Sequence, residues 1–198
     1  MVALIIDPVL GEGMGKISTT KPDTARRQLD TAIRMLFSNE DPLAIYSVVG
    51  AADRIVRDLA DKSGKSQYNE TIRQMIRPGK ESMFWKEMNK AFNFIKHAAA
   101  DPTGVLDFEE EVNDITIYIA CIYYETLGYQ LTPFMLAFRI WYILLNPDLF
   151  DETAPVMDIL FDTTFDQYRS QPRIERLKIG NQILGKVMVA KSYIYNSS

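Results

Sequence analysis

The sequence predicts an all-α protein: a single-domain bundle of about seven or eight helices, preceded by a flexible N-terminal leader. Apolar residues recur at helical spacing along most of the chain, capping residues and prolines separate these segments, and no strand-like alternation appears after residue 10. The chain has 198 residues, of which 47% are hydrophobic, enough to bury one core without a metal or disulfide bridge. We expect one helical domain over residues 23–198.

Residues 1–22 form the predicted leader, which we expect to be flexible or to pair as a short edge strand. A short β-prone run is followed by three closely spaced glycines and then by Lys16. This order resembles a phosphate-binding loop, but Leu10 occupies the position of the first required glycine. Ile17 also replaces the required hydroxyl residue, so we expect no nucleotide site here.

Two amphipathic helices are expected next. The first carries the stripe Leu29, Ile33, Leu36 and Phe37. Asp41 and Pro42 then supply an N-cap and a proline suited to the first helical turn. The second helix is expected to reach about residue 60, before Ser63 and Gly64, and one of its sides carries Tyr46, Val49, Asp53, Val56 and Ala60.

The remaining helices are delimited in the same way. A short helix over residues 68–76 ends before Pro78, and a longer one with an apolar stripe follows over residues 81–99. Residues 107–127 open with carboxylates, which favour a helix N-terminus, and continue almost entirely apolar, as in a central buried helix. Further helices are expected over residues 133–146, 154–168 and 172–191.

Charge is unevenly distributed, although the 22 basic and 26 acidic residues leave a net charge of only −4. Residues 101–167 contain 13 acidic residues and one basic residue, Arg139, whereas residues 65–96 and 169–191 are mostly basic. Such blocks indicate either electrostatic complementarity between helices or a basic surface for a polyanion. We expect the first.

Metal and thiol chemistry find little support. With one histidine and one cysteine, a metal would have to rest on carboxylates such as the row Asp158, Asp162 and Asp166, which is typical of a solvated helix face. Cys121 lies in an apolar segment and is expected in the core. We therefore expect no cofactor and no metal.

The sequence also favours a cytoplasmic protein. A lone cysteine suits a reducing compartment, and the N-terminus lacks the basic region of a secretory signal. The charge-free run over residues 126–138 is shorter than the ~18–20 residues that a membrane-spanning helix needs. We expect no membrane association.

His97 is the only imidazole and therefore the only candidate for histidine chemistry. Asn89, Asn93 and His97 are spaced to form one polar stripe on the helix over residues 81–99, with lysines nearby. A histidine near a helix C-terminus is also favoured by the helix dipole, so a solvated face is the simpler interpretation.

Two stretches of the chain resemble a family of small uncharacterised bacterial helical proteins. The first is residues 25–37 with Asp41-Pro42, and the second is residues 93–98 with Asp101-Pro102 and residues 106–108. The resemblance spans about residues 24–108. It implies a soluble protein of bacterial type and no particular activity.

Asn93 and His97 also match the Asn-x-x-x-His half of the motif of HEPN domains, to which the chain is similar. The resemblance implies a helical bundle that often dimerises and whose active members cut RNA without a metal. His97 would then act in acid–base chemistry on a ribose 2′-hydroxyl while Asn93 orients the substrate. Phe92 stands where the motif has arginine, which leaves the arginine's role at the phosphate unfilled.

The sequence thus supports two main hypotheses of function. The first is a soluble, self-associating helical interaction module without a catalytic site that binds a protein or a small ligand. It is based on the absent catalytic constellation and on the dense aromatic content of residues 115–150. The alternative is a HEPN-like protein that binds or cuts RNA with Asn93 and His97. A small-molecule enzyme with a pocket between residues 107–127 and 154–168 also remains open, without a nominated residue.

Overall fold

The computed structural model describes residues 16–65, 72, 79–97, 99, 101–147 and 166–195. Regular structure among these residues is helical throughout, with no strand, so the prediction of an all-α protein is confirmed. The helices are α1 (Lys21–Phe37), α2 (Pro42–Lys62), α4 (Glu81–Lys96), α5 (Glu111–Thr126), α6 (Pro133–Leu145), α8 (Asp166–Arg169) and α9 (Arg173–Tyr195).

Three of the helices begin where the sequence places a capping residue one or two positions before a proline. The side chains of Thr20, Asp41 and Thr132 accept hydrogen bonds from backbone N–H groups in the first turns of α1, α2 and α6, at 3.3, 2.8 and 3.2 Å. Each cap satisfies an N–H that would otherwise lack a partner, and the proline has no N–H to satisfy. Residues 1–15 of the predicted leader lie outside the described residues, whereas residues 21 and 22, also assigned to it, already belong to α1.

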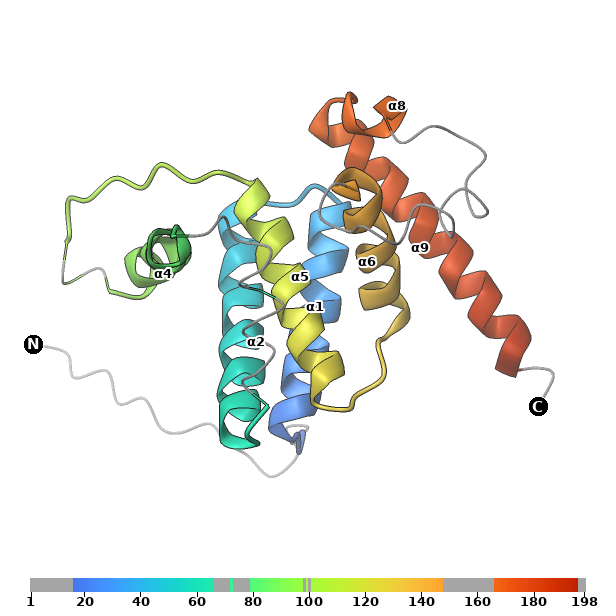
Figure 1. The fold of residues 1–198 in the computed structure, drawn as a ribbon, viewed down its shortest axis with the longest axis horizontal. Helices are drawn as coiled ribbons and strands as arrows, with labels where there is room; N and C mark the ends of the chain where they lie inside the picture. The colour runs from blue at the N-terminus through green and yellow to red at the C-terminus, as the bar shows by residue number, and fades with distance from the viewer. Residues whose placement is uncertain are drawn as a thin grey trace, which may run out of the picture.

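The core lies among α1, α2, α5 and α6, which run side by side in Figure 1. α9 packs against both α6 and α1. α5 is the central helix, and ten of its residues are buried, as its apolar sequence predicts. Cys121 is buried within it, which confirms its predicted place in the core. The aromatic residues of this region mostly pack inward too: Tyr118, Tyr123, Tyr124, Phe138, Trp141 and Tyr142 are buried.

The start of α5 differs from the prediction. The acidic residues Asp107, Glu109 and Glu110 lie before the helix, which begins at Glu111. The side chain of Phe108 packs edge-on against Tyr46 of α2, with ring centroids 5.2 Å apart. This tertiary contact attaches the irregular segment before α5 to α2, so the helical tendency of the acidic residues is overridden.

The other predicted boundaries shift less. α4 ends at Lys96 rather than near residue 99, and α9 continues to Tyr195 rather than stopping near residue 191. The predicted helix over residues 68–76 lies outside the described residues apart from the helical Ile72. Most of the helix predicted over residues 154–168 lies outside them too, as do Asp158 and Asp162 of the carboxylate row.

Ion pairs between the basic and acidic blocks of the chain connect its helices, in agreement with the predicted electrostatic complementarity. Arg173, at the start of α9, forms a bidentate ion pair with Asp114 of α5 at 2.8 and 3.0 Å and contacts Glu110 at 3.0 Å. Asp114 is only 7% exposed, and burial raises its pKa although Arg173 opposes the shift. The basic C-terminal region thus attaches to the acidic middle of the chain. No helix among the described residues is long and apolar enough to cross a membrane.

Candidate binding site around α4

α4 lies to one side of the bundle. Figure 1 shows it nearly end-on, whereas α2 and α5 run from the top to the bottom of the view. It packs on α2 through Met88, Ala91 and Phe92. The Tyr46 hydroxyl of α2 donates a hydrogen bond to the Met88 carbonyl oxygen. Gly50 permits this close approach, because a Cβ atom there would lie 2.9 Å from the Phe92 ring.

A small pocket of about 130 Å³ lies between α2 and α4. We call it the inner pocket. Its polar lining comes from Asp53, Arg54 and Arg57 of α2 and from Asn89 and Asn93 of α4. Its apolar lining includes Met88 and Phe92. The two helices thus bring a carboxylate, two guanidinium groups and two amides to one cavity.

Asp53 is the most unusual residue of the inner pocket, because it is a carboxylate only 3% exposed. Burial raises its pKa to about 6, although the neighbouring Arg57 favours the charged form. Arg57 Nη2 donates to one carboxylate oxygen of Asp53. The other oxygen, Oδ1, and the Arg57 Nε group are both buried without a hydrogen-bond partner among the described residues. Burial likewise raises the pKa of Tyr46 to about 12.

Arg57 is held in place from its other side as well. Its guanidinium carbon lies 5.3 Å from the centre of the Trp85 ring on α4, a cation–π arrangement. Arg54, which also lines the pocket, has its own counterion, because its Nε atom pairs with Asp58 at 3.1 Å. The Asp53–Arg57 pair is therefore the fixed, nearly neutral polar centre of the pocket.

A wider groove of about 500 Å³ opens on the outer side of α4. Lys90, Asn93, Phe94 and His97 line it from the helix and its end, facing Asp101, Val105 and Leu106 of the following segment. We call it the outer groove. It combines basic and amide groups with exposed apolar side chains.

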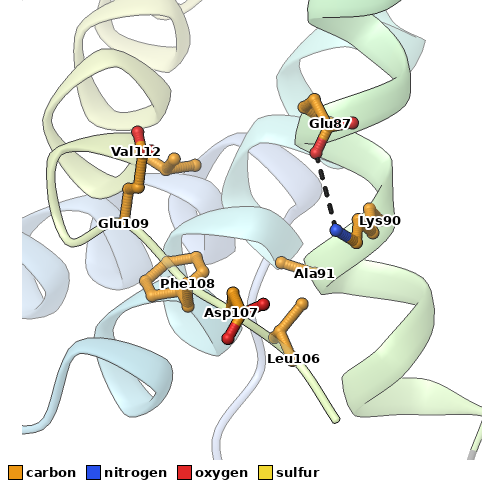
Figure 2. A pocket seen from close by; sticks show the side chains of 8 residues that line it. All are labelled: Glu87, Lys90, Ala91, Leu106, Asp107, Phe108, Glu109 and Val112. Atoms are coloured by element: carbon orange, nitrogen blue, oxygen red, sulfur yellow. Dashed lines mark ion pairs between the residues drawn. The ribbon is translucent and has the colours of Figure 1, made fainter. Parts of the chain in front are cut away.

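Next to the outer groove, a hollow of about 360 Å³ lies between α4 and the start of α5. Figure 2 shows Leu106, Asp107 and Phe108 crossing between Glu87 and Lys90 on α4 and Val112 on α5. Glu87 and Lys90 form an ion pair at 3.9 Å. Each of the three hollows is thus lined in part by α4.

The predicted site residues separate between two of these hollows. Asn93 lines both the inner pocket and the outer groove, whereas His97 lines only the outer groove. Both side chains are exposed, and His97 is the residue that caps the C-terminus of α4. Phe92, at the arginine position of the HEPN motif, packs toward α2 and carries Lys96 Nζ over its ring at 3.7 Å.

Sequence reasoning missed Asp53 and Arg57 as site residues. A signal was available, because Asp53 is the only charged position in the otherwise buried stripe of α2. A charge in an apolar stripe requires a compensating partner or a pocket. The pairing of that stripe with the amides of α4 depends on which helices become neighbours, and helical periodicity does not specify this.

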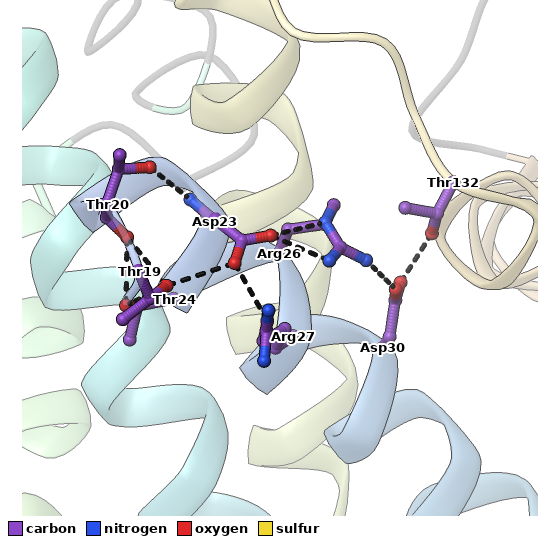
Figure 3. A network of polar contacts seen from close by, with 8 residues as sticks. All are labelled: Thr19, Thr20, Asp23, Thr24, Arg26, Arg27, Asp30 and Thr132. Atoms are coloured by element: carbon purple, nitrogen blue, oxygen red, sulfur yellow. Dashed lines mark hydrogen bonds and ion pairs between the residues drawn. The ribbon is translucent and has the colours of Figure 1, made fainter. Parts of the chain in front are cut away.

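A second polar cluster, at the corner between α1 and α6, is structural in character (Figure 3). Arg26 bridges Asp23 and Asp30 at 2.7 and 3.3 Å, and the Thr132 hydroxyl donates to Asp30. The charges in this cluster are paired with one another. It therefore joins the N-terminus of α6 to α1.

No group of three or more histidine, cysteine, aspartate or glutamate side chains in the described part of the chain is arranged to hold a metal ion. Comparisons with protein-family models, with curated proteins and with solved structures found no match. The two family resemblances therefore remain predictions from sequence.

Proposed function

We propose that this protein is a helical interaction module that associates with a second copy of itself through the α4 edge, defined here as α4 together with residues 101–110. The observation that carries the proposal is the exposure of large apolar side chains on this edge. Met83, Phe94, Ile95 and Val105 are 57%, 38%, 37% and 87% exposed. These are four of the eleven large apolar side chains that are exposed in the described part of the chain, and exposed apolar residues grouped on one element are typical of an interaction surface.

The charges of the α4 edge favour a second copy as the partner. α4 carries the exposed lysines Lys86, Lys90 and Lys96 beside the acidic Glu87, whereas the adjoining segment carries only acids among its exposed charges: Asp101, Asp107, Glu109 and Glu110. In a two-fold symmetric dimer each patch meets its own copy, so a patch with basic and acidic halves is self-complementary. The lysines of each copy would then face the acidic segment of the other.

The size of the edge sets the expected strength of association. A 16-residue helix is about 24 Å long, so α4 and its adjoining segment provide less area than the ~800 Å² per partner of a standard interface. Small interfaces of this kind belong to weak, reversible complexes. We therefore expect a dimer that forms in the micromolar range and dissociates on dilution.

Sedimentation velocity over a series of concentrations tests the proposal. The unmodified protein should pass from monomer to dimer, and Phe94→Asp or Val105→Asp should remain monomeric because each buries an unpaired charge in the interface. Leu136→Asp is the matched control, since Leu136 is 43% exposed on α6, outside the α4 edge. Circular dichroism verifies that each variant is folded. A protein that is monomeric at every concentration, or a Leu136→Asp variant that dissociates equally, would contradict the proposal.

RNA processing is the second candidate function, because Asn93, His97 and Lys90 line the same open groove. This arrangement supports a general acid–base role for His97 beside a lysine that offsets phosphate charge. A labelled single-stranded RNA should then be cleaved by the protein and left intact by His97→Ala. The same sequence built entirely of 2′-deoxynucleotides should resist cleavage, because the reaction needs the 2′-hydroxyl. Equal cleavage by both proteins would exclude His97.

A further inference from the structure

The inner pocket contains a hydrogen-bonding pair that the protein leaves unused. Asp53 Oδ1 is an acceptor, Arg57 Nε–H is a donor, and both are buried without a partner among the described residues. Leaving such groups unsatisfied in a folded protein costs free energy, so an unpartnered donor and acceptor on residues that line a cavity indicate an occupant. Both residues line the same cavity.

The charges of the pocket indicate the chemistry of the occupant. Asp53 and Arg57 already neutralise each other through the Nη2–Oδ2 contact, and Arg54 is paired with Asp58. A charged ligand would leave one buried charge without a counterion, which is strongly unfavourable. A neutral molecule that offers one N–H donor and one carbonyl acceptor satisfies both open groups at once.

We infer that the inner pocket binds a small neutral molecule with an amide-type edge, in which an N–H group donates to Asp53 Oδ1 and the adjacent carbonyl oxygen accepts from Arg57 Nε. Asn89 and Asn93, which are amides themselves, lie on the α4 side of the pocket and can pair with further polar atoms of the ligand. The volume of about 130 Å³ compares with the ~150 Å³ cavity that accommodates benzene, so the ligand has about six to eight non-hydrogen atoms. Cyclic amides and imides fit both requirements.

The inference is tested with 2-pyrrolidone, a cyclic amide of this size, as the probe. Cyclopentanone has the same ring and carbonyl but lacks the N–H, and N-methyl-2-pyrrolidone replaces the N–H with a methyl group. In ¹H–¹⁵N NMR titrations of the full chain, 2-pyrrolidone should shift the side-chain amide resonances of Asn89 and Asn93 saturably. It should bind roughly tenfold or more tightly than either control, because the controls leave Asp53 Oδ1 unsatisfied.

The Asp53→Asn variant should lose the preference for the cyclic amide over the ketone. The asparagine oxygen should take the place of Oδ2 and accept from Arg57, so that its NH₂ group occupies the place of Oδ1 and the site offers two donors. Binding of 2-pyrrolidone should then weaken to the level of cyclopentanone, which needs only donors. Asp61→Asn, on the same helix but exposed and outside the pocket lining, should keep the preference of the unmodified protein.

Equal binding of the cyclic amide and the ketone, or no saturable shift at the inner pocket, would overturn the inference and leave water as the occupant. The binding of 2-pyrrolidone does not depend on the proposed self-association. Phe94→Asp should abolish the dimer and keep 2-pyrrolidone binding, whereas Asp53→Asn should abolish the amide preference and keep the dimer. Each proposal therefore fails on its own measurement.

Discussion

The Asp53→Asn variant also tests whether a buried carboxylate lies between α2 and α4. The asparagine has the same shape as a protonated aspartic acid but carries no charge at any pH. Because the Asp53 carboxylate is almost completely buried, its charge opposes folding wherever it is ionised. The substitution should therefore remove a pH-dependent loss of stability from the protein.

The sign and size of the effect follow from the two pKa values. The pKa of Asp53 is about 6 in the folded state and 3.8 in the unfolded chain, so the folded state holds its proton more tightly. The stabilisation from this group is fully present below pH 3.8 and is lost as the pH rises through about 6. A difference of 2.2 pKa units makes the loss between pH 4 and pH 7 about 2 to 3 kcal/mol.

Urea unfolding of the unmodified protein and of Asp53→Asn, measured at several pH values from 4 to 7, gives the required free energies. The difference in the free energy of unfolding should shift by about 2 to 3 kcal/mol in favour of Asp53→Asn across that range. Asp61→Asn should run parallel to the unmodified protein, because Asp61 is an exposed carboxylate of the same helix. A difference that stays constant between pH 4 and pH 7 would refute the assignment of a buried, destabilising charge to Asp53.

Other substitutions test the packing of the remaining helices. Arg173→Ala should lower the free energy of unfolding in urea by about 3 to 5 kcal/mol, because it leaves the buried Asp114 carboxylate without its bidentate partner; a loss below about 1 kcal/mol would contradict this pairing. Gly180→Ala should lower the melting temperature, since its Cβ would lie 2.2 Å from a phenylalanine ring of α1. Gly185→Ala, in the same helix with nothing within 4 Å, should raise stability by about 0.5–1 kcal/mol, and equal effects of both alanines would argue against the α1–α9 contact. Cys121 should resist thiol reagents in the native protein and react in urea, because burial raises its pKa and shields its sulfur; rapid labelling of the native protein would contradict the position of α5.

The helices themselves were largely predictable from local chemistry. A capping oxygen beside a proline determines the starts of α2 and α6, and apolar residues at helical spacing identify the buried faces of α1 and α2. The start of α5 was not predictable in this way. There the contact between Phe108 and Tyr46 decides the path of the chain, and the two residues lie far apart in the sequence.

The candidate site was predictable only in its parts. The polar stripe containing Asn89, Asn93 and His97 is evident from spacing, and its exposure agrees with the expected solvated face. The inner pocket requires in addition that Gly50 lets α4 approach α2, so that Asn89 and Asn93 line the same cavity as Asp53. Which helices become neighbours depends on the packing of the whole core, and a periodic pattern within one helix carries no information about it.

The two tryptophans, Trp85 and Trp141, report on the folding of two different parts of the molecule. Trp85 lies on α4, where it packs against Phe84 and beneath Arg57, whereas Trp141 is fully buried in α6 and donates its indole N–H to the Arg176 carbonyl oxygen at 2.6 Å. Because a peripheral helix can detach at a lower free energy than the core unfolds, Trp85 fluorescence should change at lower urea concentration than Trp141 fluorescence. Replacing either tryptophan by phenylalanine leaves a single fluorescence signal. The opening of α4 and the unfolding of the bundle can then be followed separately in two variants of the same protein.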